Sequence, residues 1–305
     1  MANRAPLFHI GYHKTGTTWM QRRLFQKPHG YAPFDPDIDA THQAVFEHVT
    51  RPHQLAFDAK AARAALLSSQ DNAELTPVIS SEILSGHPFW GGRDSADFAQ
   101  RLHAIAPEAK ILITIRAQIP AIASVYMQYV RRAGTLPAAR FFEGTRVLGY
   151  DGFDPVHFEY HRLTAHYQNL FGAGQVKVMT QEALAADPAA FVADLSSFTG
   201  APDQPVPSTK REGASESEAA TPILRRINHV IQDGANPSPV LNLGPASAAA
   251  YRGTGWAFRK LKSKGLMTGK PVTAEARRCF AGHYGPSNRR LMEICDGLEL
   301  PGYEV

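Results

Sequence analysis

Short apolar runs alternate with helix-like segments along the first two hundred residues of the chain. The clearest run, residues 110–116, is continuously apolar and β-branched at its centre, which is typical of a parallel strand covered on both faces. Between the runs, apolar residues recur at helical spacing behind aspartate or proline starts. The predicted strands are residues 7–10, 77–80, 110–116 and 176–179, and the predicted helices are 19–25, 58–68, 97–105, 120–131, 156–171 and 187–198.

This alternation predicts an α/β fold with a mostly parallel central sheet flanked by helices, because strand–helix–strand units close through right-handed crossovers. The Pro- and His-rich residues 27–51 fit a connecting segment over the sheet edge, and residues 134–155 fit a loop.

The last third of the chain predicts a different organisation. No run after Gly200 predicts a strand, and the helical pattern continues between Pro- and Gly-rich turns. We expect one domain over residues 1–305, with an α/β core at about 5–200 and a helical C-terminal part at about 201–305. The helices expected in that part are 215–234, 247–264 and 274–297.

The segment LFHIGYHKTGTTWMQRRLF, residues 7–25, joins the first strand to a helix through a polar turn. Lys14 lies inside this turn and Gly16 closes it. Backbone N–H groups at a helix start have no partner within the helix, and the helix dipole adds positive potential there. Such a turn binds anions, and Lys14 adds a charge while the hydroxyls of Thr17 and Thr18 add donors. The segment therefore predicts a phosphate-binding loop.

The spacing of this loop separates it from two common nucleotide motifs. A nucleoside-triphosphatase loop places lysine directly after its second glycine, whereas this chain has Thr17 there and carries its lysine at position 14. The GxGxxG pattern of dinucleotide-binding folds is absent. An ATP-dependent P-loop kinase would also need an acidic metal ligand at a later strand end. It stays as one alternative function, and a non-catalytic nucleotide-binding protein is the other.

The motif HKTGTTW closely resembles the KxGTTW-type loop of sulfotransferases, including bacterial ones, that use 3′-phosphoadenosine 5′-phosphosulfate (PAPS). In that family the loop holds the 5′-phosphosulfate end of the donor. The family's second signature is an arginine at a strand end and a serine eight residues later, which bind the 3′-phosphate; Arg116 and Ser124 match it. A guanidinium bonds phosphate oxygens in pairs, and a hydroxyl adds a further bond. The Asn-Pro that often follows the arginine is replaced by Ala117 and Gln118.

The resemblance implies a three-layer, P-loop NTPase-like fold and a sulfuryl transfer from PAPS to an acceptor hydroxyl or amine. Adenosine 3′,5′-bisphosphate would be released, and no metal would be required. Trp19 either stacks on the adenine or fills the core, and the resemblance favours the cofactor contact. A late basic segment that touches the 3′-phosphate in the family is matched loosely, at Arg211. The implied donor-binding residues are Lys14, Thr15, Gly16, Thr17, Thr18, Trp19, Arg116, Ser124 and Arg211.

Lys14 and Glu82 are the predicted catalytic residues. Sulfuryl transfer, like phosphoryl transfer, is an in-line displacement that depends on positioning and on charge stabilisation. Lys14 suits the charge of the leaving phosphate. Glu82 follows the second predicted strand at the sheet edge where ligands gather, and members of the family use either a histidine or a glutamate as the base there. His87 and His13 are the alternative bases, and a capping or paired carboxylate is the alternative role of Glu82.

The acceptor is predicted only by class. Residues 235–273 contain no acidic side chain and carry a group of cations from Arg252 to Lys270. This stretch is interpreted as a basic surface for an acidic glycan or lipid headgroup, as a membrane-surface patch, or as a solvated helix face, which is the commonest role of such a stretch. The loop at 134–155 is a candidate acceptor lid. A small-molecule, glycan or lipid acceptor is expected, and no nucleic-acid partner.

Composition changes this picture little. The chain of 305 residues is 44% hydrophobic and 20% charged with a net charge of +4, which is ordinary for a globular protein. Its two cysteines, Cys279 and Cys295, exclude a disulfide framework and a cysteine-rich zinc site, and its histidines match no HExxH pattern. The N-terminus lacks a signal-peptide core and no stretch reaches the length of a membrane span. A cytoplasmic location is therefore expected.

Overall fold

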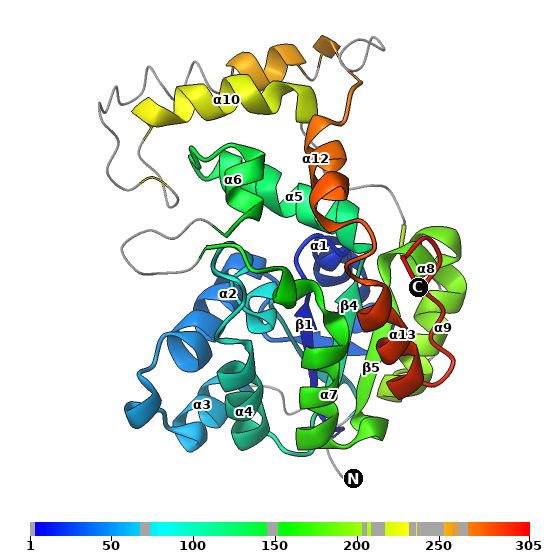
Figure 1. Ribbon diagram of the computed structural model, residues 1–305. Coiled ribbons are helices and arrows are strands. Elements are labelled where there is room, and N and C mark those ends of the chain that lie inside the picture. Colours follow the sequence, from blue (N-terminus) through cyan, green and yellow to red (C-terminus); the bar gives the residue numbers. More distant parts are fainter. Residues whose placement is uncertain are drawn as a thin grey trace.

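A five-stranded parallel sheet forms the centre of the protein. The computed structural model describes residues 4–67, 74–144, 152–202, 206–208, 217–231, 236, 253–258, 260–261 and 268–305. Strand order is β2-β3-β1-β4-β5, every neighbouring pair is parallel, and helices surround the sheet (Figure 1). The predicted α/β class with a mostly parallel sheet is confirmed. The strands are β1 (Leu7–Gly11), β2 (Tyr31–Pro33), β3 (Thr76–Ser80), β4 (Lys110–Ile115) and β5 (Val176–Thr180).

The six helices predicted before Gly200 are present with slightly different ends, and further helices over residues 38–45, 138–142 and 181–186 were not predicted. Local signals set their ends: Asp187 accepts the N–H groups of Ala189 and Ala190 at the start of α9, and Gly200, with φ 76°, ends that helix. The helices are α1 (Thr17–Trp19, continued by a π-helical turn over Met20–Leu24), α2 (Ile38–Val45), α3 (Ala59–Leu67), α4 (Ser95–Ile105), α5 (Gln118–Arg131), α6 (Ala138–Phe142), α7 (Tyr160–Phe171), α8 (Gln181–Ala186), α9 (Pro188–Thr199), α10 (Thr221–Ile227), α12 (Pro271–Phe280) and α13 (Gly285–Ile294).

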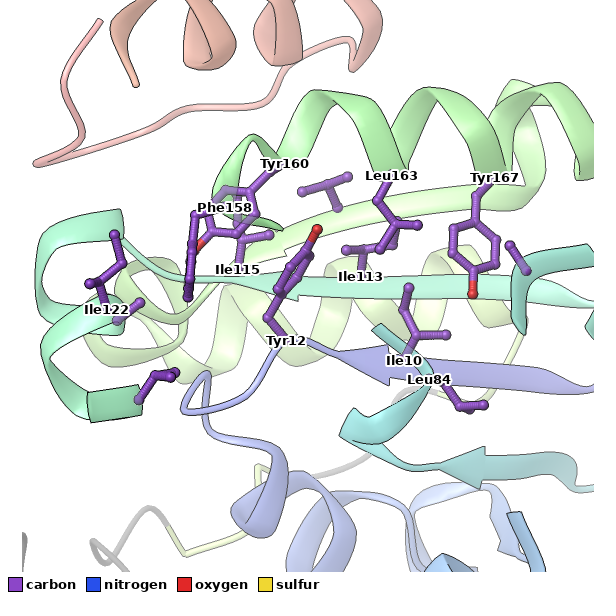
Figure 2. Packing of buried hydrophobic residues seen from close by; sticks show 14 of the residues in the cluster. Ile10, Tyr12, Leu84, Ile113, Ile115, Ile122, Phe158, Tyr160, Leu163 and Tyr167 are labelled. Carbon is purple, nitrogen blue, oxygen red and sulfur yellow. The ribbon is translucent and has the colours of Figure 1, made fainter. Parts of the chain in front are cut away.

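Both faces of the sheet are buried, because alternate residues of its central strands enter two separate hydrophobic clusters. Ile10 and Ile113 belong to one cluster, which includes side chains of α4, α5 and α7. Leu7 and Leu112 belong to the other, which includes side chains of α1 and α9. Figure 2 shows Leu163 of α7 over Ile113 on the first face. Side chains that alternate between two covered faces produce the expected three layers.

Several elements differ from the expectations. Strand β2 and helix α2 both lie inside residues 27–51, which were expected as a connecting segment. Strand β2 was missed for a local reason. Its three residues are too few to show a period, and Pro33 is tolerated because β2 is an edge strand. Helix α6 lies inside the expected loop at 134–155. The helix expected over 274–297 is two helices, α12 and α13, and Gly282, with φ 75°, lies in the turn between them.

The C-terminal helices pack on the first face of the core. Helix α12 contacts α5, and α13 contacts α7. Buried Asn288 of α13 accepts a hydrogen bond from Gln118 Nε2 at 2.6 Å and donates one to the Glu304 carbonyl at 2.7 Å. The end of the chain is therefore attached to the start of α5. Among the described helices, none has the length and apolar character needed to cross a bilayer.

Candidate active site

The loop after β1 is held in a conformation that leaves its backbone donors available. Lys14 has φ 67° and Gly16 has φ 90°, left-handed values that are uncommon for a residue with a side chain such as lysine. Within the described chain, the N–H groups of residues 14–18 donate no backbone hydrogen bond. A row of unpaired N–H groups beside a lysine fits an anion.

Gly11 brings this loop close to the end of β3. A Cβ atom at Gly11, whose φ is 76°, would lie 2.9 Å from Glu82 Cβ, which is too close for any other residue. The loop and Glu82 therefore share one edge of the sheet, outside the carboxyl ends of β1 and β3. Ligands of open α/β sheets bind at this edge.

Thr15 anchors the loop from below. Its side chain is 1% exposed, and its Oγ1 donates to the Tyr12 carbonyl at 2.6 Å and lies 2.7 Å from Thr114 Oγ1 on β4. Thr17 is also buried, whereas Thr18 is exposed. Of the three threonines predicted to bind the donor, Thr15 therefore directs its hydroxyl into the protein, and Thr18 directs its side chain outward.

A buried histidine extends this anchor across the sheet. The ring of His9 lies on β1 with Nδ1 2.7 Å from Ser80 Oγ and Nε2 3.0 Å from Thr114 Oγ1. Burial lowers the pKa of His9 to about 3, so the ring is neutral at neutral pH. The chain Ser80–His9–Thr114–Thr15 crosses β3, β1 and β4 and ends in the loop. It fixes the loop to three strands at once.

Lys14 lies among cations from other elements. Burial lowers the pKa of Lys14, the charge of Arg131 lowers it further, Glu82 opposes the shift, and Arg116 and Arg132 add to it. No carboxylate of the described residues lies within ion-pair distance of the Lys14 amine. The side chain thus lies in a partly desolvated place without a paired anion among the described residues, which is typical of a site for an anionic ligand.

Glu82 is a carboxylate whose charge acts on Lys14. It begins the short 3₁₀ turn Glu82–Ser85 directly after β3. Its Oε2 forms no hydrogen bond within the described chain and lies 3.7 Å from His42 Nε2. The other ring nitrogen of His42 lies 2.7 Å from Ser81 Oγ. His42 therefore faces Glu82 in an orientation fixed by a neighbouring side chain.

Three further histidines lie close to one another at this edge. Burial lowers the pKa of His13 well below its ordinary value, and the charges of His157, His87, Lys14 and His42 lower it further. Burial also lowers the pKa of His87 to about 4 and that of His157 to about 3. All three rings are therefore neutral at neutral pH. His13 and His87, the predicted alternative bases, lie in the same region as Glu82.

Arg116 follows β4 at the same edge, and its backbone is fixed from three elements. The hydroxyl of Tyr160 donates to the Arg116 carbonyl at 2.7 Å. The Ala117 N–H donates to Glu182 Oε1 at 3.1 Å, and Tyr303 Oη donates to Glu182 Oε2 at 3.1 Å. Because the charges of Arg116 and Lys14 act on each other, the two predicted phosphate-binding signatures are neighbours in the fold.

The other predicted donor-binding residues differ in their surroundings. Ser124 lies on α5, partly exposed, about 9 Å along the helix axis from its first residue. Trp19 is 9% exposed and packs in the second hydrophobic cluster, and its Nε1 donates to the Ser208 carbonyl at 2.9 Å. Its ring thus already fills core space. Arg211 lies outside the described residues.

Several residues at this edge were not predicted from the sequence. In the sequence, Arg131 and Arg132 are two basic residues at the end of a predicted helix, which is common, and neither His42 nor Glu182 was predicted as a site residue. Tyr303 comes from the last five residues of the chain. These side chains reach the site through tertiary packing, which leaves no local signal.

The comparison with known proteins identifies the family. A model of the sulfotransferase family matches residues 6–205. The chain belongs to the sulfotransferase family. The matched range of this sulfotransferase includes Lys14, Glu82, Arg116 and Ser124, and Arg211 lies beyond it. Membership indicates a transferase that acts on sulfuryl groups, as the loop motif predicted.

A solved sulfotransferase structure shares the fold. The crystal structure of a sulfotransferase from Alicyclobacillus acidocaldarius aligns with 85% of this chain and 96% of its own, at 23% identity and a TM-score of 0.50. A sulfotransferase domain from the curacin biosynthetic pathway aligns with 92% of this chain and 98% of its own, at 14% identity and a TM-score of 0.43. No curated protein sequence matches the chain.

Proposed function

We propose that this protein transfers a sulfuryl group from PAPS to a hydroxyl or amine of an acceptor and releases adenosine 3′,5′-bisphosphate. The observation that carries the proposal is the proximity of Lys14 and Arg116, whose charges act on each other across two neighbouring strand ends. Two adjacent cationic sites at one sheet edge suit a nucleotide with an anionic group on each side of its ribose.

The residues of the first site fit the 5′ end of such a donor. The loop offers unpaired N–H groups at residues 14–18 and a lysine without an ion-pair partner in the described chain. When bound, PAPS supplies the sulfuryl group and the phosphate that leaves with the nucleotide. Lys14 stabilises the negative charge on that phosphate, and the anion in turn favours the charged lysine, offsetting the lowering of the Lys14 pKa by burial.

Arg116 and Ser124 form the proposed site for the 3′-phosphate. The guanidinium and the hydroxyl come from the end of β4 and the second turn of α5, so the phosphate lies against the start of this helix, where its dipole is positive. Tyr160, Glu182 and Tyr303 hold the backbone here and act as positioning residues.

Glu82 is the proposed base. Its Oε2 forms no hydrogen bond in the described chain, and the carboxylate lies opposite the lysine-bearing loop. It takes the proton of the acceptor hydroxyl as the oxygen attacks sulfur. His42, 3.7 Å away, orients the carboxylate. The neutral rings of His13 and His87 are the alternative proton acceptors.

Sulfate transfer from ³⁵S-labelled PAPS tests this function. The protein is incubated with the donor and with separate pools of glycans, glycolipids and small hydroxyl compounds. Labelled product must form together with an equal amount of adenosine 3′,5′-bisphosphate. Phosphate transfer from ATP in a magnesium-containing assay, without any sulfate transfer, would support the kinase alternative instead. Tight bisphosphate binding without transfer to any pool would support a non-catalytic binding protein.

A further inference from the structure

A second basic group lies at the far end of α5 from Arg116. Arg131 ends this helix and Arg132 follows it. The 14 residues of α5 span about 21 Å, so this pair is remote from the proposed 3′-phosphate site. Both charges nevertheless act on Lys14, and Arg132 acts on His87. The pair therefore lies toward the reacting end of the donor, where an acceptor enters.

Neither arginine has an anionic partner within the described chain. Cations at a helix C-terminus are favoured by the dipole alone, which would explain one exposed arginine. Many other arginines here pair with a carboxylate, as Arg51 does with Glu47 and Arg290 does with Glu293. In contrast, no described carboxylate lies within ion-pair distance of Arg131 or Arg132. The charges of these two arginines and of Lys14 disfavour one another, and a bound anion would relieve this repulsion.

An exposed aromatic ring belongs to the short turn that packs against α5. Trp90 is 58% exposed, and its ring stacks on that of His87 with centroids 4.1 Å apart and planes at 26°. Its neighbour Phe89 packs against Tyr129 of α5 at 5.8 Å. The Tyr129 hydroxyl accepts hydrogen bonds from the N–H groups of Thr135 and Leu136, at 3.1 Å and 3.2 Å. The 3₁₀ turn Pro88–Trp90 and the end of α5 thus form one fixed rim.

We propose that Trp90, Arg131 and Arg132 bind an acidic sugar unit of the acceptor. The proposal rests on the sulfotransferase function proposed above and names its acceptor class. A flat, exposed indole presents an apolar face to a sugar ring while its N–H group can stay hydrated. Each guanidinium group can donate two parallel hydrogen bonds to a carboxylate or sulfate. Trp90, Arg131 and Arg132 are all exposed, whereas a small apolar acceptor would need an enclosed pocket that buries most of its surface.

The test is calorimetry with hexasaccharides of hyaluronan, chondroitin and polygalacturonate, in the presence of saturating adenosine 3′,5′-bisphosphate. The carboxyl-reduced, neutral form of each sugar is the ligand control. We expect at least one acidic hexasaccharide to bind and its neutral form to bind roughly tenfold or more weakly. Trp90→Ala and the double variant Arg131→Ala, Arg132→Ala should each lose roughly tenfold or more. Their affinity for the bisphosphate should stay within about twofold.

One matched variant separates this site from general surface effects. The pair Arg289→Ala, Arg290→Ala removes adjacent arginines of α13. This variant should bind the sugar normally. Equal binding of acidic and neutral sugars, unchanged binding by the rim variants, or binding only to anionic phospholipid vesicles would overturn the proposal. If the double variant Arg131→Ala, Arg132→Ala also loses affinity for the bisphosphate, the two arginines bind the donor and the proposal is wrong. Failure of the unmodified protein to bind the bisphosphate would overturn the proposed function itself.

Discussion

The hydroxyl groups of Thr15 and Thr114 lie 2.7 Å apart, and this contact joins the two halves of the proposed donor site. Thr15 belongs to the phosphate-binding loop. Thr114 belongs to β4, two residues before Arg116. His9 holds Thr114 from the other side at 3.0 Å. The loop and the arginine therefore rest on one buried polar network rather than on two independent turns.

Replacing Thr114 with valine should weaken both the fold and the donor site. The substitution keeps the shape but leaves His9 Nε2 and the Thr15 hydroxyl without their partner, which costs about 1–3 kcal/mol. Urea unfolding should show this loss, and bisphosphate affinity should fall several-fold. Thr114→Ser, which restores a hydroxyl, is the control. Equal behaviour of the valine and serine variants would show that the network does not support the loop.

Lys14 can be tested without changing the backbone conformation. Asparagine tolerates a positive φ better than most residues, so Lys14→Asn removes the charge while keeping the turn that φ 67° requires. Turnover should fall by about 10²–10³-fold, mostly in kcat. Steady-state kinetics with PAPS checks this. A variant that retains kcat and only raises KM would mean that Lys14 binds the donor without stabilising the leaving group.

Glu82→Gln should abolish turnover and leave donor-product binding intact. Glutamine keeps the size of the side chain beside Gly11 but cannot accept a proton in the reaction. Bisphosphate affinity, measured by calorimetry, should stay within about twofold. Glu47→Gln, at an exposed pair on a neighbouring segment, is the matched control and should keep full activity. Substantial turnover by the Glu82 variant would move the role of base to His13 or His87.

The last residues of the chain should affect recognition of the 3′-phosphate. Tyr303→Phe removes the 3.1 Å hydrogen bond to Glu182, which holds the Ala117 N–H next to Arg116. A loss of about 1 kcal/mol, or roughly fivefold in affinity, is expected for adenosine 3′,5′-bisphosphate. Binding of adenosine 5′-monophosphate, which lacks the 3′-phosphate, should not change. Equal losses for both nucleotides would mean that Tyr303 supports the fold in general.

His9 should make the protein sensitive to acid. The unfolded chain binds a proton at an ordinary histidine pKa, whereas burial lowers the pKa of folded His9 to about 3. Between pH 6.5 and about 3 the unfolded state therefore holds the extra proton, and His9 lowers the free energy of unfolding by about 1.4 kcal/mol for each unit that the pH falls. The slope measured by urea unfolding should be smaller in His9→Gln by that amount. The same dependence of the unfolding free energy on pH in both proteins would contradict this role of His9.

The sequence was sufficient where a local pattern encodes the structure. The continuous apolar run of β4, the caps of α9 and the glycine-flanked loop each follow from the chemistry of adjacent residues, and the family match agrees with the loop motif. Strand β2 was not predicted because three residues at a sheet edge show no periodic pattern of apolar side chains. Glu182, Tyr303 and the pair Arg131–Arg132 were not predicted as site residues because folding brings them to the site from distant positions in the sequence.

The proposed donor site requires one nucleotide with two separated anionic groups to bridge Lys14 and Arg116. Calorimetric titration with adenosine 3′,5′-bisphosphate and with ATP, each with and without magnesium, tests it most directly. We expect micromolar or tighter binding of the bisphosphate, on the order of −8 kcal/mol, that does not depend on magnesium, and much weaker binding of ATP. Tight, magnesium-dependent binding of ATP without binding of the bisphosphate would contradict the account.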